Sequence, residues 1–248
     1  MKDLMEYRKV TDSLAVFYST SQDGNMSSKF GDEAEVLRNK CAFFDSLGMD
    51  LKNTCCFKVS NSDAIYEFTY KDIPDDKDIS RLELTTDAIL TNTRDVFFYL
   101  AFGDCIPFVL FDTRRDILGF VHLSWFSICK KLHQKILAKL VKEYNSKPDD
   151  LICLFGPSIR ADSYCFSAPD QLGMPEWKNY IYKNKNGLYA VDLIKFVVDD
   201  ILSLNFSEEN IYCSQVDTGS DDNFYSHFRS VNDKSWEEGR FIFGGKLS

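Results

Sequence analysis

Three short apolar runs follow one another in the middle of the chain and limit the folds that it can adopt. They are VFFYLAF at 96–102, IPFVLF at 106–111 and ILGFVH at 117–122. A strand with one face in water alternates apolar and polar residues, whereas these runs are apolar at nearly every position. We therefore expect strands that are covered on both faces, in a protein large enough to supply both covers.

Helices that could supply such cover are also predicted. Residues 31–48 form one, with Asp32 as its N-terminal cap and Gly48 as its end. In residues 127–144 (SICKKLHQKILAKLVKEY), apolar residues recur every four positions, which predicts one continuous amphipathic helix. On that helix His133 stands among lysines, so we expect it on a solvated or boundary face.

The order of these elements indicates the fold class. Strands and helices are mixed without strict alternation, and neither a linker nor an internal repeat is visible. We therefore predict an α+β protein, a single domain over residues 1–248 with mixed β-sheets flanked by helices.

Composition excludes several kinds of partner. The chain has 29 Lys and Arg against 38 Asp and Glu, a net charge of −9, and an acidic chain repels nucleic acid. Residues 1–12 lack the apolar stretch of a signal peptide, and the apolar runs are far shorter than the ~20 residues that cross a bilayer. The eight cysteines form no CxxC pair. We expect a cytoplasmic protein that binds neither nucleic acid nor membrane.

Cys105 and His122 are the first candidates for chemistry. If the runs at 106–111 and 117–122 pair as neighbouring strands about the turn at 113–116, Cys105 and His122 meet at one end of the pair. The imidazole could then deprotonate the thiol and create a nucleophile. Alternatively, thiolate and imidazole could be two ligands of a metal such as zinc. Two buried core residues would give the same pattern, so the residues alone leave all three interpretations open.

Seven segments in the same order resemble the laccase-domain (YfiH-like) family, and together they span nearly the whole chain. They are GNMSSKFGDEAEVLRNK, TTDAILTNTRDVFFYLAFGDCIPFVLFD, ILGFVHLSWFS, LICLFGPSIRADSYCF, VDLIKFVVDDILSLNFSEENIYCS, FYSHFRS and EEGRFIFG. The resemblance implies the YfiH-like fold. It also implies a site in which one cysteine and two histidines bind zinc and carry out catalysis. Cys105 and His122 match two of these positions, while Ser60 stands at the third, where the family has a histidine.

The resemblance further implies a purine nucleoside phosphorylase-like enzyme that acts on adenosine- or inosine-type nucleosides by phosphorolysis, deamination or both. Nucleoside and phosphate would be its partners, with Lys40, Arg229 and Arg240 as phosphate-binding cations. Ser60 implies that zinc binding and catalysis are impaired. A copper cluster is not expected, because it needs on the order of ten imidazoles and the chain has 3 His.

Two alternatives to that enzyme remain. The chain could be a non-catalytic module of the same fold that binds a small molecule or a protein partner. It could also be a metal-free hydrolase with Cys105 as nucleophile and His122 as base, because losing one metal ligand does not prevent that chemistry.

Overall fold

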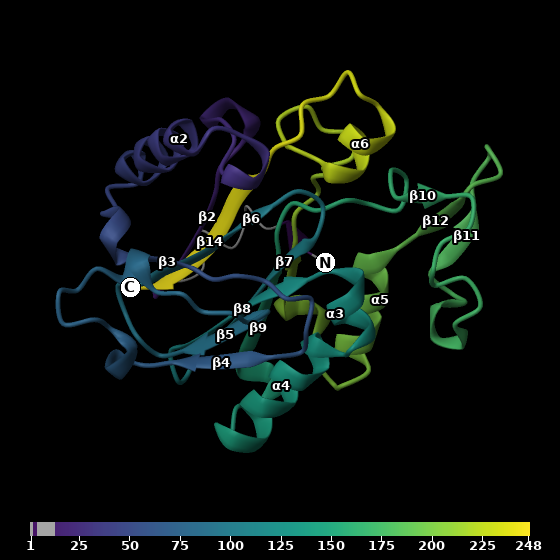
Figure 1. The fold of residues 1–248 in the computed structure, drawn as a ribbon. Coiled ribbons are helices and arrows are strands. Elements are labelled where there is room, and N and C mark those ends of the chain that lie inside the picture. Colours follow the sequence, from purple (N-terminus) through teal and green to yellow (C-terminus); the bar gives the residue numbers. More distant parts are fainter. Residues whose placement is uncertain (1, 4–12) are drawn as a thin grey trace.

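The computed structural model describes residues 2–3 and 13–248, so most of the N-terminal segment that argues against a signal peptide lies outside it. Its largest sheet has seven strands in the order β1-β13-β9-β7-β8-β5-β4 (Figure 1). Their bounds are Lys2–Asp3 (β1), Ile65–Phe68 (β4), Ala88–Thr91 (β5), Ile106–Asp112 (β7), Ile117–Leu123 (β8), Leu151–Phe155 (β9) and Ile211–Cys213 (β13). Both parallel and antiparallel neighbours occur in it, which confirms the predicted mixed sheet.

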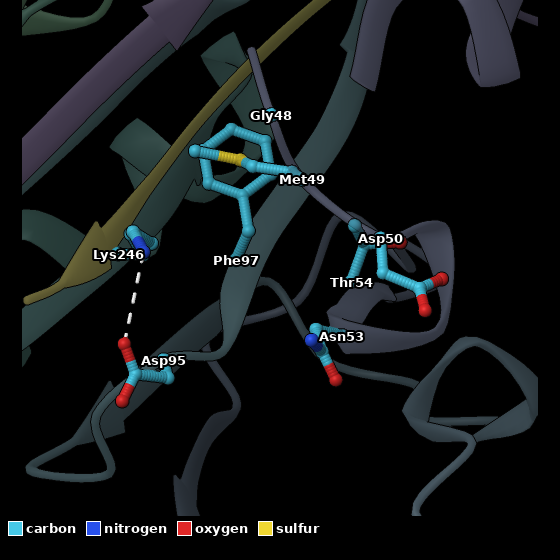
Figure 2. A pocket seen from close by; sticks show the side chains of 8 residues that line it. All are labelled: Gly48, Met49, Asp50, Asn53, Thr54, Asp95, Phe97 and Lys246. Carbon is cyan, nitrogen blue, oxygen red and sulfur yellow. Dashed lines mark ion pairs between the residues drawn. The ribbon is translucent and has the colours of Figure 1, made fainter. Parts of the chain in front are cut away.

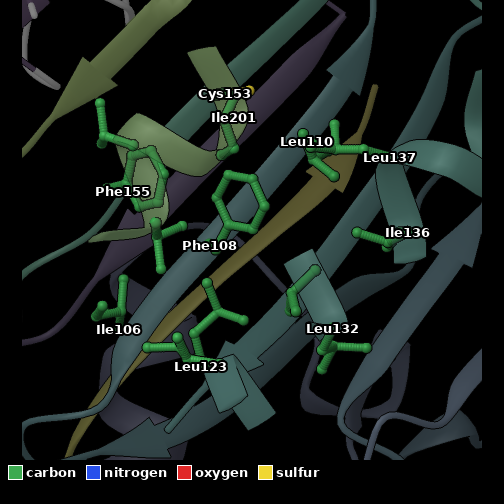
Figure 3. Packing of buried hydrophobic residues seen from close by; sticks show 14 of the residues in the cluster. Ile106, Phe108, Leu110, Leu123, Leu132, Ile136, Leu137, Cys153, Phe155 and Ile201 are labelled. Carbon is green, nitrogen blue, oxygen red and sulfur yellow. The ribbon is translucent and has the colours of Figure 1, made fainter. Parts of the chain in front are cut away.

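The two central strands are buried on both faces, as their apolar sequences predict. Successive residues of β7 point to opposite faces, so Phe108 and Leu110 belong to one core, and Val109 and Phe111 to another. The first core lies under the helices α4 (Leu132–Glu143) and α5 (Leu193–Leu202). Figure 3 shows part of that packing, in which Phe108 lies beside Phe155 with ring centroids 4.7 Å apart.

A second, four-stranded sheet covers the other face of β7 and β8. Its order is β2-β14-β6-β3, with bounds Leu14–Tyr18 (β2), Thr54–Cys56 (β3), Phe97–Phe102 (β6) and Phe241–Leu247 (β14). Helix α2 (Glu33–Ser46) covers the outer face of this sheet, where Phe44 packs edge-on against Phe97. The main body therefore has four layers: helices, large sheet, smaller sheet, helix (Figure 1).

The remaining elements lie around one end of these layers. A short sheet of β10 (Cys165–Phe166), β12 (Tyr189–Val191) and β11 (Ile181–Lys183) projects to one side (Figure 1). Helix α6 (His227–Asn232) follows a polar loop in the tail. No helix in the described ranges is long and apolar enough to span a bilayer.

One predicted helix is wrong in its continuity. Residues 127–144 contain two helices, α3 (Trp125–Cys129) and α4, because Lys131 between them adopts a left-handed backbone with φ of 60°. This break redirects the second helix. As a result His133 is fully buried against Asp200 of α5 and does not lie on a solvated face.

Candidate active site

The hairpin of β7 and β8 brings Cys105 and His122 together. In its register Pro107 lies opposite His122, so Cys105, immediately before β7, is a diagonal neighbour of His122 on the same face. Cys105 is also close enough to His122 to contribute to the raised pKa of the imidazole. The strand pairing predicted from the apolar runs is therefore confirmed, and it brings Cys105 and His122 to the same end of the hairpin.

A third group, Asp87, completes a chain of contacts. It lies immediately before β5, which pairs with β8, and its Oδ1 is 3.1 Å from His122 Nδ1. The backbone N–H of His122 also donates to the Asp87 carbonyl at 2.8 Å. Because Asp87 engages Nδ1, the other ring nitrogen, Nε2, is the one left to face Cys105.

The turn Ser60–Ser62 surrounds the Asp87 carboxylate. Its three backbone N–H groups donate to the carboxylate at 3.1, 3.1 and 2.7 Å, and the hydroxyls of Ser60 and Ser62 donate at 3.0 and 2.8 Å. Asn61, in the middle, has φ of 53°. Immediately after α3, the Lys130 ammonium donates to the Asn61 carbonyl at 2.8 Å and holds the turn in place.

Burial and hydrogen bonding shift the pKa values of Asp87 and His122. Burial alone would raise the pKa of Asp87, but hydrogen bonds from His122 and from the turn Ser60–Ser62 outweigh this effect and hold that pKa well below its usual range. Burial alone would lower the pKa of His122, but its interactions with Cys105 and Asp87 raise it to about 9. The surroundings of His122 therefore favour the charged form of its imidazole.

Cys105 faces a cavity of about 640 Å³. Six of the residues that line the cavity are aromatic, and they come from segments far apart in the sequence: Phe30, Trp125, Phe126, Tyr164, Phe166 and Phe228. Aromatic walls of this kind suit a flat, partly apolar ligand.

In the lining of this cavity, the polar side chains of Arg240 and His227 both contact Glu238. The Arg240 guanidinium lies 3.9 Å from the centre of the Phe30 ring and 3.5 Å from Glu238 Oε1. Burial lowers the pKa of Arg240 from its ordinary value, although nearby acidic groups oppose this effect. Glu238 also binds His227 Nδ1 at 2.6 Å, and Lys29 adds a second cation to the lining.

Asp104, the neighbour of Cys105, ties this wall to the tail of the chain. Its carboxylate accepts hydrogen bonds from Thr218 Oγ1 at 2.8 Å and from the Phe228 N–H at 2.7 Å. Its φ of 118° is unusual for a residue other than glycine. Backbone strain of this kind is often found beside functional side chains.

Two of the three cations that the resemblance implies for phosphate lie away from the cavity. Arg229 donates to the carbonyls of Asp221 and Phe224, at 3.1 and 2.6 Å, and stacks on Trp236. The Lys40 ammonium lies 5.7 Å from the centre of the Tyr99 ring. Neither is among the described residues that line the cavity, whereas Arg240 is.

A smaller cavity of about 240 Å³ lies between the residues that follow α2 and the end of β14 (Figure 2). Lys246 and Asp95 form an ion pair at its edge, with nitrogen and oxygen 3.7 Å apart. Its described lining has neither a thiol nor an imidazole. The cavity at Cys105 is therefore the better candidate for catalysis.

The donors around Cys105 do not fit a catalytic zinc site, which uses three protein ligands and one open position. Among the described residues, no three His, Cys, Asp or Glu side chains are placed to hold a metal ion together. The resemblance implies that Ser60 is at the family's third ligand position, and in the structure its hydroxyl donates to Asp87. Asp87 in turn is bound to His122.

Sequence reasoning missed Asp87 and Glu238. A signal for Asp87 was present, because a carboxylate immediately before an apolar strand must find partners when it is buried. No local pattern links Asp87 to His122, which is 35 residues away.

Comparison with known proteins supports the resemblance. A family model described as multi-copper polyphenol oxidoreductase laccase matches residues 9–243. Purine nucleoside phosphorylase YlmD of Bacillus subtilis is 23% identical over 205 residues, which cover 79% of this chain and 73% of the relative. Adenosine deaminase RL5, from an unknown prokaryotic organism, is 24% identical over 151 residues, which cover 60% of this chain and 56% of the relative.

A solved structure shows that the fold is shared. The crystal structure of YlmD from Geobacillus stearothermophilus matches with a TM-score of 0.82 at 19% identity, covering 95% of this chain and 92% of that one. The predicted fold, one domain with mixed sheets and flanking helices, is therefore confirmed.

Proposed function

Because this chain belongs to the multi-copper polyphenol oxidoreductase laccase family, we propose that it is an enzyme that acts on purine nucleosides in the cavity at Cys105. The relatives named as a purine nucleoside phosphorylase and an adenosine deaminase support this substrate class. The single observation that carries the proposal is the hairpin register, which places Cys105 and His122 as diagonal neighbours at the wall of a cavity with aromatic side chains.

The cavity offers distinct environments for the parts of such a substrate. A purine ring stacks on aromatic side chains such as Trp125 and Phe228. Phosphate, or the ribose hydroxyls, meet Arg240 and Lys29. In the proposed binding mode, the bond between base and sugar lies in the same cavity as the Cys105 thiol.

Phosphorolysis at this site needs one proton transfer. A phosphate oxygen forms a bond to C1′ of the ribose, the bond from C1′ to the purine breaks, and its electron pair stays on the purine. The Cys105 thiol donates a proton to the purine, and the His122 imidazolium stabilises the resulting thiolate. The proton that phosphate loses on becoming an ester then restores the thiol.

Deamination would use the same pair. Water adds to C6 of adenosine and ammonia leaves, so the product is inosine and phosphate is not consumed. Conversion with and without phosphate therefore separates the two reactions.

The test is to incubate the purified full chain with adenosine or inosine, with and without phosphate, and to separate the products by chromatography. We expect Cys105→Ala to lower the rate by about a thousandfold or more. Cys41→Ala is the matched control, because Cys41 lies on α2, outside the cavity lining. Absence of turnover in the wild-type protein, or full activity in Cys105→Ala, contradicts the proposal.

A further inference from the structure

The position at which the family has its third metal ligand serves a different purpose in this chain. Ser60 uses both its backbone N–H and its hydroxyl to bind Asp87 Oδ2, at 3.1 and 3.0 Å. Ser62 donates twice more to the same oxygen, and Asn61 donates to Oδ1. We call these three residues, Ser60–Ser62, the serine turn.

These contacts determine which ring nitrogen of His122 carries the proton that faces Asp87. Asp87 is fully buried, and an ionised carboxylate only accepts hydrogen bonds. His122 Nδ1 must therefore carry the proton that it shares with Asp87 Oδ1. Nε2 is then the ring nitrogen that remains to interact with the Cys105 thiol.

We propose that Asp87 is a positioning residue that holds His122 against Cys105, so that the site works as a cysteine–histidine–aspartate relay without a metal. The serine turn is the device that holds Asp87. Ser60 therefore does not bind a metal in this proposal. It fixes the His122 imidazole indirectly, by holding the Asp87 carboxylate. This inference rests on the proposed function only for the reaction that the relay serves, because the contacts that define it are independent of the substrate.

As in hydrolytic triads, a buried carboxylate fixes the orientation of the imidazole beside the reactive side chain. The imidazole that contacts the thiol has its other nitrogen fixed by a buried carboxylate. No donor is left over to complete a zinc site in the described part of the chain. The thiol itself faces the cavity, where a small electrophile can reach it.

The first experiment measures how fast iodoacetamide alkylates Cys105 at one fixed pH, with mass spectrometry of the digested protein as the readout. Cys165, which is also partly exposed, is the internal reference in each digest. We expect Asp87→Asn to slow alkylation of Cys105 by about tenfold to a hundredfold. Asp200→Asn removes the carboxylate of a second histidine–aspartate pair, and we expect it to leave Cys105 unchanged.

Two milder variants keep the test decisive if Asp87→Asn does not fold. Ser60→Ala removes one donor to Asp87 and should slow alkylation roughly two- to tenfold. Ser60→Thr keeps the hydroxyl and should retain the wild-type rate. Equal rates in the wild-type protein and Ser60→Ala, or equal slowing by Asp87→Asn and Asp200→Asn, would overturn the proposal.

The wild-type protein alone provides the test for metal. One equivalent of zinc sulfate should leave alkylation of Cys105 unchanged, and dialysed protein should hold no stoichiometric zinc by elemental analysis. Protection of Cys105 by equimolar zinc would overturn the metal-free relay. If alkylation follows this pattern while no nucleoside is converted, the proposed function is wrong and the relay stands.

Discussion

Two histidine–aspartate pairs in this molecule have nearly the same geometry and different surroundings. His122 Nδ1 lies 3.1 Å from Asp87, and His133 Nε2 lies 2.9 Å from Asp200, with both imidazoles buried. His122 meets a thiol that faces a cavity. The remaining ring nitrogen of His133, Nδ1, has no hydrogen-bond partner among the described residues.

The two pairs also differ in charge. Burial would lower the pKa of both histidines, and at His122 the contacts with Cys105 and Asp87 overcome that effect. At His133 burial prevails over the attraction of Asp200, and the cation of Lys131 adds to the lowering of the pKa. A carboxylate partner alone therefore does not make a histidine reactive, because the second ring nitrogen and its access to a ligand decide that.

The largest expected effect separates the two histidines by activity. His122→Gln should lower nucleoside conversion by about a hundredfold to ten-thousandfold, because the thiolate formed in the reaction loses its cation. His133→Gln should leave kcat within about twofold at a temperature where the variant stays folded. Steady-state rates on adenosine and inosine measure both. Equal losses in the two variants would remove the distinction between the pairs.

The next effect concerns binding at two tryptophans. Trp125→Ala removes a ring from the cavity and should weaken nucleoside binding by about 1–3 kcal/mol, measured by calorimetry. Trp177 is the matched control, because it is fully buried and stacks on Phe196, beside His133. Trp177→Phe should lower the melting temperature and leave the nucleoside affinity unchanged. Loss of affinity in Trp177→Phe instead would place the ligand elsewhere.

A third prediction concerns the stability of the His133 pair. Asp200 also binds Lys131 and Gln134, at 3.0 and 2.8 Å, so Asp200→Asn leaves several groups without their partner. We expect the free energy of unfolding to fall by about 1–3 kcal/mol in urea titrations. An Asp200→Asn variant with wild-type stability would show that this pair does not have the structural role assigned to it.

The smallest effects appear in the pH dependence of stability, with opposite signs for the two pairs. The pKa of His122 is raised from 6.5 to about 9, so protonation of this imidazole stabilises the fold. The stabilisation is complete below about pH 6.5 and is lost as the pH rises through about 9. The pKa of His133 is lowered, so the fold opposes protonation of this imidazole. The stability of the fold therefore falls as the pH drops below 6.5, the ordinary pKa of histidine.

Melting temperatures between about pH 5 and pH 10 test these signs. His122→Gln should flatten the alkaline side of the curve, and His133→Gln should flatten the acidic side. The opposite assignment would mean that the charges of the two imidazoles are reversed.

How far the sequence could predict this site depends on how far apart in the sequence the contacting residues lie. The pairing of residues 106–111 with residues 117–122 was predictable, because both runs are apolar and a short turn joins them. The link from His122 to Asp87 was not, because it needs the order of strands in the sheet, which no local pattern encodes.

Other features of the structure depend on single residues whose type does not predict their conformation or their contacts. Lysine gives no signal for a left-handed backbone, so the break at Lys131 and the burial of His133 were missed. Arg229 and Arg240 are alike in sequence, yet one stacks on Trp236 and satisfies backbone carbonyls while the other lines the cavity. The choice between such roles is made by tertiary packing.

The most direct test of the central claim is to follow the ring nitrogens of all 3 His by NMR with ¹⁵N-labelled histidine while adenosine and phosphate are added. We expect His122 to keep a protonated Nδ1 and its Nε2 signal to shift on binding, while both His133 signals stay in place. An unmoved His122 signal under saturating adenosine, or a His122 with its proton absent from Nδ1, would contradict this expectation.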